Sequence, residues 1–234
     1  MILSIIFAVL SLVTCVLFCV FRAKKASNFS LALKSLASIF FVLSGLCVQI
    51  RYGYSTLATL VLIGLIFGLV GDVVLDLKVM YPKQSNTYFL LGTAAFAIGH
   101  MFYFVTTMLF NMMTTPNTLI VSLVVSLLVS IALTTGIMIS SKKMNLNFGS
   151  NKIAVIAYSV VLTFMLCYSV AVAIFNPIYW IFAGGMLLFL LSDLVLSMQY
   201  FGGRDQKSLI FVNHITYYLA QIMFVVFLVV LMVV

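Results

Sequence analysis

The sequence predicts an all-α integral membrane protein, a bundle of eight transmembrane helices. The chain is 65% hydrophobic and only 7% charged, so its 234 residues carry too little polar surface to cover a water-soluble globule. The apolar residues form long continuous runs instead of the alternating pattern of membrane strands. Because hydrocarbon offers backbone N–H and C=O groups no partner, such runs must form helices.

Each run approaches the roughly 20 residues that a helix needs to cross about 30 Å of hydrocarbon. Short breaks separate the runs, and in chain order they include Arg22-Ala23-Lys24-Lys25, Tyr81-Pro82-Lys83, Thr115-Pro116-Asn117, Lys142-Lys143, Asn176-Pro177 and Gly202-Gly203-Arg204. The first run lacks the basic start and small-residue cleavage site of a secretion signal, so we interpret it as a retained span. We expect one transmembrane domain over 1–234, with spans at 1–21, 31–50, 56–77, 86–110, 117–140, 152–174, 178–200 and 208–234.

The basic residues predict the orientation of the bundle. When loops are assigned alternately to the two sides, one side carries only Arg51 and the other carries Arg22, Lys24, Lys25, Lys34, Lys78, Lys83, Lys142, Lys143, Lys152, Arg204 and Lys207. Since Lys and Arg are enriched in cytoplasmic loops, we expect the larger group in the cytoplasm and both termini outside it. The net charge of +8 is spread in ones and twos, which is typical of a topology signal, and we expect no nucleic-acid partner.

The two halves of the chain share short patterns. The third span contains Asp72-Val73-Val74-Leu75 and the seventh contains Asp193-Leu194-Val195-Leu196. A tyrosine follows three residues after His100 in the fourth span and after His214 in the eighth. These matches indicate two parallel four-helix repeats, while chance matches in apolar sequence leave a bundle without repeats as the alternative.

Three acidic residues lie inside the predicted spans, where one at the membrane centre carries an insertion penalty of about 3 kcal/mol. Asp72 and Asp76 lie toward the predicted cytoplasmic end of the third span, and Asp193 lies toward the same end of the seventh. Lys34 falls at a similar depth in the second span. We therefore expect a polar cavity that opens to the cytoplasm, with Asp72 and Asp193 facing it.

Helical spacing directs these side chains into the bundle. Gly64, Gly68, Asp72 and Asp76 recur every fourth residue, and small residues allow a neighbouring helix to approach closely. The same spacing predicts further polar side chains on the cavity walls, namely His100 and Tyr103 in the fourth span and His214, Tyr217 and Gln221 in the eighth.

Each candidate also has a structural interpretation. Asp76 lies near the interface, where an ion pair with Lys78 accounts for it as well as substrate binding does. Lys34 suits an interfacial anchor, a counter-ion to an aspartate or a ligand for a lipid phosphate. Histidines, tyrosines and glutamine also form hydrogen bonds between helices, so Tyr103, Tyr217 and Gln221 have a packing role as their alternative.

We expect no metal and no other cofactor. A zinc site built from His100, His214 and an aspartate is the alternative, but the chain has no His or Cys spacing motif for it. All four cysteines lie within apolar runs, where they act as small hydrophobic residues.

Five short motifs, taken in order, resemble the YhhN-like lysoplasmalogenase family. They are Lys34-Ser35-Leu36, Gly71-Asp72-Val73-Val74-Leu75, Gly99-His100-Met101-Phe102-Tyr103, the segment 184–193 that ends in Ser192-Asp193, and Tyr217-Tyr218-Leu219-Ala220-Gln221. The family often has Lys-Pro-Leu at the first motif. The resemblance implies hydrolysis of the vinyl ether bond of lysoplasmalogens, which releases a fatty aldehyde and a glycerophospho-headgroup.

This reaction needs an acid to protonate carbon and a base to activate water, as two carboxylates do in glycoside hydrolysis. Asp72 and Asp193 are the candidates for these roles, and the sequence leaves open which is which. His100 and Tyr103 are candidates for proton relay, and Lys34 for binding the headgroup phosphate. The expected partners are a lysophospholipid substrate and the lipid bilayer, with the oligomeric state open.

Two other classes of function use the same residues. A proton-coupled transporter of lipids or small molecules would also bury acids and would suit a repeated half, but none of the polar spans is interrupted by proline at mid-depth. The other is a scaffold or receptor whose polar contacts are structural, but such a protein would not need Asp72 and Asp193 inside its spans.

Overall fold

The computed structural model describes residues 1–204 and 206–233, and within these ranges it contains helices and no strands. The eight long helices are α1 (Ile2–Arg22), α2 (Asn28–Tyr52), α3 (Thr56–Met80), α4 (Ser85–Thr114), α5 (Leu119–Lys143), α6 (Lys152–Phe175), α7 (Trp180–Gly202) and α8 (Lys207–Val233). Each is long and apolar enough to cross a membrane, which confirms the predicted fold class. The predicted last residue of the eighth span, Val234, lies outside the described residues.

Helix ends differ from the prediction by a few residues, for local reasons. α2 begins three residues earlier than expected because Ser27 and Ser30 form a capping box, in which each side chain accepts a hydrogen bond from the other residue's backbone N–H. α4 extends to Thr114 and ends before Pro116, which starts a short 3₁₀ turn.

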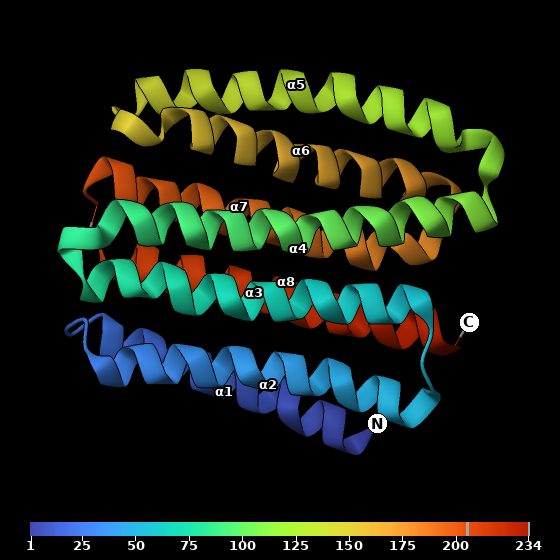
Figure 1. Ribbon diagram of the computed structural model, residues 1–234, viewed down its shortest axis with the longest axis horizontal. Helices are drawn as coiled ribbons and strands as arrows, with labels where there is room; N and C mark the ends of the chain where they lie inside the picture. Colours follow the sequence, from blue (N-terminus) through green and yellow to red (C-terminus); the bar gives the residue numbers. More distant parts are fainter. Residues whose placement is uncertain (205, 234) are drawn as a thin grey trace.

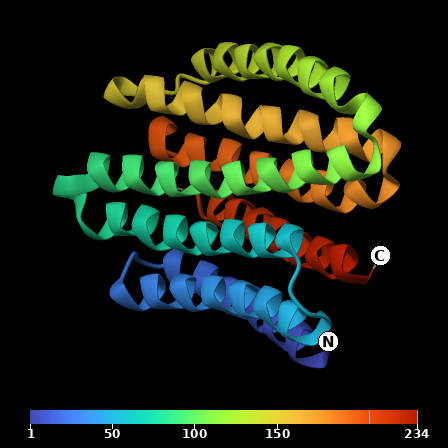
Figure 2. The same ribbon diagram turned by 45° about the vertical axis from the view of Figure 1, so that its right-hand side comes forward.

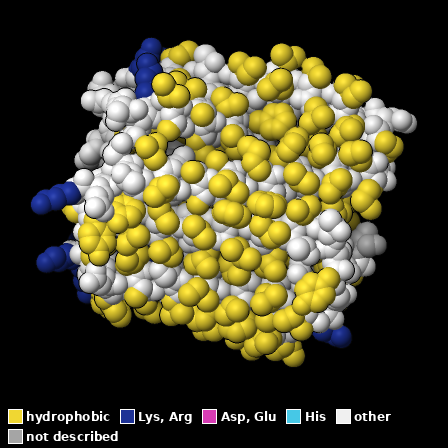
Figure 3. All heavy atoms as spheres, viewed as in Figure 1, with side chains coloured by type: hydrophobic (Ala, Val, Ile, Leu, Met, Phe, Trp, Pro, Cys, Tyr) yellow, Lys and Arg dark blue, Asp and Glu magenta, His cyan; other side chains and the backbone are white. Residues whose placement is uncertain are grey.

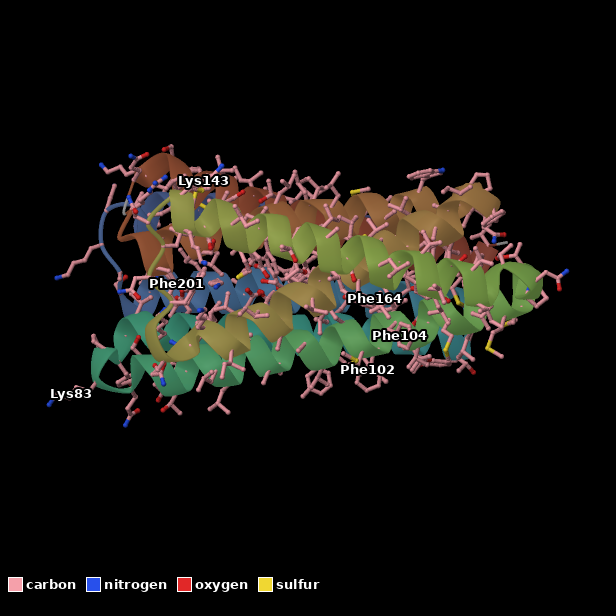
Figure 4. All side chains as sticks on the ribbon, turned by 90° about the horizontal axis from the view of Figure 1, so that it is seen from above. Lys83, Phe102, Phe104, Lys143, Phe164 and Phe201 are labelled. Atoms are coloured by element: carbon pink, nitrogen blue, oxygen red, sulfur yellow. The ribbon has the colours of Figure 1, made fainter. Side chains whose placement is uncertain are left out.

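The helices run antiparallel to their sequence neighbours and form stacked layers (Figures 1 and 2). The pair α1 and α2 forms one edge, α3 and α8 follow, then α4 and α7, and α6 and α5 form the opposite edge. Both termini lie at one end of the bundle, and the turn between α3 and α4 lies at the other (Figure 1). We call this second end the basic end, because Lys83 and Lys143 lie there (Figure 4).

The contacts between helices follow the same pattern in both halves. α2 packs on α1, α3 and α8, and α6 packs on α5, α7 and α4. The closest pair in each half is α3 with α4 and α7 with α8. This arrangement is the one that a parallel four-helix repeat would have, although duplication of the chain itself stays a prediction.

Glycines on α3 allow α4 to approach closely. A Cβ atom at Gly64 would overlap the ring of Tyr103, and one at Gly71 would lie 2.7 Å from the ring of Phe96. Larger side chains at these positions would push the two helices apart. Of the stripe predicted from the sequence, Gly64 packs against α4, whereas Gly68 and Asp72 face Tyr217 of α8. Gly71, outside that stripe, provides the second close contact with α4.

The outer surface matches a lipid environment. Apolar side chains cover the face shown in Figure 3, and the Lys and Arg side chains visible there lie at the ends of the bundle. Many large apolar residues on α1 and α5 are exposed, including Ile2, Val9, Ile120 and Leu128. Since water would not tolerate so large an apolar area, the chain is a multi-pass membrane protein.

The orientation prediction can be tested at two exposed loop residues. Asn145 lies in the connection from α5 to α6 at the basic end, and Asn117 lies before α5 at the opposite end. In a background with the four native cysteines replaced, we expect an impermeant thiol reagent to label cysteine at 117 from outside intact cells. Cysteine at 145 should react only after permeabilisation, and labelling of both positions from the same side would contradict the orientation.

Candidate functional site

A buried polar network surrounds Asp72 in the half of the bundle nearer the basic end. Its Oδ2 accepts hydrogen bonds from the hydroxyls of Ser38 and Tyr217, each at 2.7 Å. The Lys34 ammonium lies 3.5 Å from Oδ1. Tyr218 donates to the Lys34 carbonyl at 3.0 Å. Asp72 is 2% exposed. Its partners come from α2 and α8, both of which pack on α3.

Asp76 belongs to the same network, one turn closer to the basic end. Arg22 of α1 binds its carboxylate through both terminal nitrogens, at 3.1 and 3.2 Å, and Lys34 lies 3.8 Å away. The interpretation that Asp76 pairs with Lys78 is wrong, because these residues stand two apart on a helix and point in different directions. Two cations and two carboxylates thus balance one another inside the bundle.

Asp193 lies in a different environment, on the wall of a cavity of about 400 Å³. The cavity lies between α4, α5, α6 and α7, and its lining is mostly apolar, with Leu133, Ile137 and Leu162 among its residues. Tyr158 of α6 lies on the same wall. No cation of the described residues lies within ion-pair distance of Asp193. Asp193 therefore presents a carboxyl group without a counter-ion to an apolar space.

The predicted repeat would pair Lys34 with Val155. The same number of residues separates Lys34 from Asp72 and Val155 from Asp193, and α2 and α6 occupy corresponding places. Where the first half has a lysine, the second half thus has a valine, and that valine lines the cavity. The first aspartate is neutralised by Lys34, and the second faces the cavity without a counter-ion among the described residues.

An aromatic wall separates the two carboxylates. Phe96 lines the cavity, and its ring packs against Tyr217, with the ring centroids 6.0 Å apart. Tyr217 in turn donates to Asp72. The sequence predicted that both aspartates face one cavity, whereas the structure places Asp193 on the cavity wall and Asp72 behind Phe96.

His100 lies buried beside this wall. Its Nδ1 is 2.7 Å from the Phe96 carbonyl oxygen, which can only accept, so Nδ1 carries the proton and Nε2 carries a lone pair. Nε2 has no hydrogen-bond partner within the described residues. The Tyr158 hydroxyl lies beside the Asp193 carboxyl but has no partner at hydrogen-bond distance among them. The two ring centroids are 6.3 Å apart. A lone pair and a hydroxyl donor without partners thus lie close to the Asp193 cavity.

The remaining candidates from the sequence serve mainly as the frame of the site. Tyr103 packs between Gly64 and the rings of Phe182 and Phe224. Gln221 lies against Gly68, and its side-chain carbonyl has no partner in the described ranges. His214 lies away from the cavity, with its ring edge on Phe18.

Sequence reasoning missed Arg22, Ser38 and Tyr158. Arg22 was read only as a loop cation, although its place at the end of a span allows its long side chain to reach back into the bundle. Ser38 stands four residues after Lys34, which is the signal that would have placed it on the same helix face. Tyr158 offers no such signal, because no ionisable residue stands near it within its span.

Among the residues that the structure describes, no three His, Cys, Asp or Glu side chains converge closely enough to hold a metal ion. His100 and His214 bind carbonyls of their own helices, at Phe96 and Ile210. The alternative of a zinc site that uses both histidines therefore finds no support in their positions.

Comparison with known proteins places the chain in a family. The YhhN family matches residues 52–228, which run from the end of α2 to α8 and include Asp72, His100 and Asp193. Lys34 lies outside the matched residues, so the first of the five motifs is not part of this match. No curated protein and no solved structure matched the chain. Because the match covers most of the chain and both aspartates, this protein belongs to the YhhN family.

Proposed function

We propose that this protein is a membrane-embedded hydrolase that cleaves the vinyl ether bond of lysoplasmalogens. The YhhN family includes lysoplasmalogenases. The observation that carries the proposal is the Asp193 carboxyl, which faces a mostly apolar cavity of about 400 Å³ without a counter-ion. A cavity of this kind suits a single hydrocarbon chain whose reactive group meets one acid.

Asp193 is the proton donor in this proposal. An isolated carboxylate is costly to hold in an apolar space, so the protonated carboxyl is the form that suits the cavity. Asp72 instead carries the negative charge, because Lys34 and two hydroxyl donors bind its oxygens. These contacts support Asp193 as the acid, and they leave Asp72 as a charged group within the protein.

The reaction then takes three steps. Asp193 transfers its proton to the β-carbon of the vinyl ether, and the double bond becomes a C–H bond and an oxocarbenium ion. A water molecule adds to the cationic carbon and returns a proton to the Asp193 carboxylate. The resulting hemiacetal breaks its bond to the glycerol oxygen, which gives a fatty aldehyde and the glycerophospho-headgroup. Asp193 acts first as acid and then as base, as in retaining glycosidases.

His100 and Tyr158 suit the orientation of the attacking water. A water molecule needs both donors and acceptors around it, and the free Nε2 of His100 accepts while the Tyr158 hydroxyl donates. The other candidates have structural roles in this proposal, which differ from the substrate-binding roles suggested by the sequence. Tyr103, Tyr217 and Gln221 shape the wall, and Lys34 and Asp76 hold the charge of Asp72 in place.

A proton-coupled transporter is the alternative from another class of function. Transporters of this kind often bind their substrate at broken helices near mid-depth. Here α3, α4, α7 and α8 are each continuous, and the two aspartates differ in their contacts. These observations favour a fixed site for chemistry.

The type of bond that is cleaved tests the proposal. Only an enol ether offers a carbon that a carboxylic acid can protonate to give a stabilised cation, so we expect purified protein to release fatty aldehyde from an alkenyl lysolipid. In deuterated water, the label should appear at the α-carbon of the aldehyde. The alkyl lysolipid of the same chain length should stay intact.

Transbilayer movement of the lysolipid is followed in the same vesicles. Movement without aldehyde release would favour the transporter, and equal cleavage of an acyl lysolipid would point to an ester hydrolase. Either result would contradict the proposed reaction.

A further inference from the structure

Lys78 lies in an aromatic box at the basic end of the cavity. Its ammonium is 3.5 Å from the ring centroid of Tyr200, 5.0 Å from that of Phe89 and 5.7 Å from that of Phe201. All three rings line the Asp193 cavity. Figure 4 shows Phe201 at the same end of the bundle as Lys83 and Lys143. Lys78 thus lies directly behind the rim of the cavity, between α3, α4 and α7.

Lys78 differs from the other buried cations in having no anion beside it. Arg22 and Lys34 both bind carboxylates, whereas no carboxylate among the described residues lies within ion-pair distance of Lys78. The aromatic rings orient its ammonium but cannot accept its N–H groups as an anion would. A half-buried ammonium with free donors beside a cavity is a binding group for an anionic ligand.

The distance from Lys78 to Asp193 matches a lysophospholipid. Tyr200 follows Asp193 by two helical turns on α7, a rise of about 10 Å. In a lysoplasmalogen, seven bonds join the β-carbon of the vinyl ether to phosphorus, and an extended chain of that many bonds spans roughly 8 Å. When the reacting carbon lies at Asp193, the phosphate therefore reaches the end of the cavity where Lys78 lies.

We propose that Lys78 binds the phosphate of the lysolipid headgroup and makes the cavity selective for phosphorylated single-chain ether lipids. This inference depends on the proposed function for its substrate class. Lys34, which the sequence suggested for this role, already binds two aspartates. Tyr200, Phe89 and Phe201 hold the Lys78 ammonium directly behind the cavity lining, and the phosphate would reach it between these rings.

The first test compares two alkenyl substrates that differ only in the phosphate. For alkenyl lysophosphatidylethanolamine, Lys78→Met should raise KM by about 10- to 100-fold, the effect expected of a hydrogen bond to a charged group. The phosphate-free alkenylglycerol should be cleaved with unchanged kcat/KM, and Lys78→Arg should keep most of the affinity for the phosphorylated lipid. Lys83→Met, which changes an exposed lysine of the same end, is the matched control. Equal effects of Lys78→Met on both substrates would overturn the proposal.

The second test needs no turnover, so its failure is distinguishable from failure of the proposed function. The alkyl lysophosphatidylethanolamine should bind the wild-type protein and bind the Lys78→Met variant about 10- to 100-fold more weakly. Inorganic phosphate as competitor distinguishes a lipid site from a simple anion site. Displacement of the lipid by millimolar phosphate would show that the site binds any phosphate and does not recognise the lipid. Equal binding by wild type and variant would show that Lys78 does not bind the headgroup phosphate.

Discussion

Asp193→Asn should abolish most turnover of the alkenyl lysolipid while the protein stays folded. The substitution keeps the shape of the side chain but removes the only carboxyl group among the residues that line the cavity. Loss of a general acid typically lowers kcat by about 10²- to 10⁴-fold. Because Asp193 forms no ion pair among the described residues, its loss should leave elution of the purified protein on size exclusion unchanged. Aldehyde release and elution are measured on the same preparation.

Asp193→Glu is the matched variant. It retains the carboxyl and moves it by one methylene, so it should keep more activity than Asp193→Asn. If the Asn variant turns over at the wild-type rate, Asp193 is not the acid and the mechanism fails. If both variants lose activity together with the folded protein, the residue is structural.

Lys34→Met should lower stability more than any single surface substitution. It leaves the carboxylates of Asp72 and Asp76 with Arg22 as their one remaining cation, in a region that is almost completely buried. Removing one partner of a buried ion pair typically costs about 3–5 kcal/mol. We expect a lower yield of folded protein and aggregation at a lower temperature in detergent.

A charge-balanced double variant separates this cause from lost packing. Lys34→Met combined with Asp72→Asn restores neutrality and should recover part of the lost stability, because the uncompensated charge is gone. Lys83→Met, at an exposed position, should leave stability unchanged. If the double variant is no more stable than Lys34→Met alone, the uncompensated charge is not the cause of the lost stability.

The sequence predicts the fold well and the site only in part. Eight long apolar runs determine eight helices, because membrane backbone has no other way to pair its polar groups. The spacing of Gly64, Gly68 and Asp72 correctly directs the acids inward. What spacing along one helix cannot provide is the identity of the neighbour across the interface, and for this reason the partners of Asp76 and Lys78 could not be predicted.

The difference between the two aspartates also depends on tertiary structure. Asp72 and Asp193 stand in similar short motifs, yet one is surrounded by donors from α2 and α8 and the other faces a cavity. Tyr158 could not be predicted as a site residue, because its surroundings also depend on the tertiary structure. Its hydroxyl becomes informative only when the fold buries it without a partner.

The buried group formed by Arg22, Lys34, Asp72 and Asp76 also has a consequence for how the helices insert into the membrane. α3 carries two carboxylates, and inserting them without counter-ions would be costly for any helix in hydrocarbon. The ribosome makes α1 and α2 first, so Arg22 and Lys34 are synthesised before Asp72 and Asp76. If α1 and α2 insert before α3, pairing with Arg22 and Lys34 would lower the cost of inserting its two carboxylates.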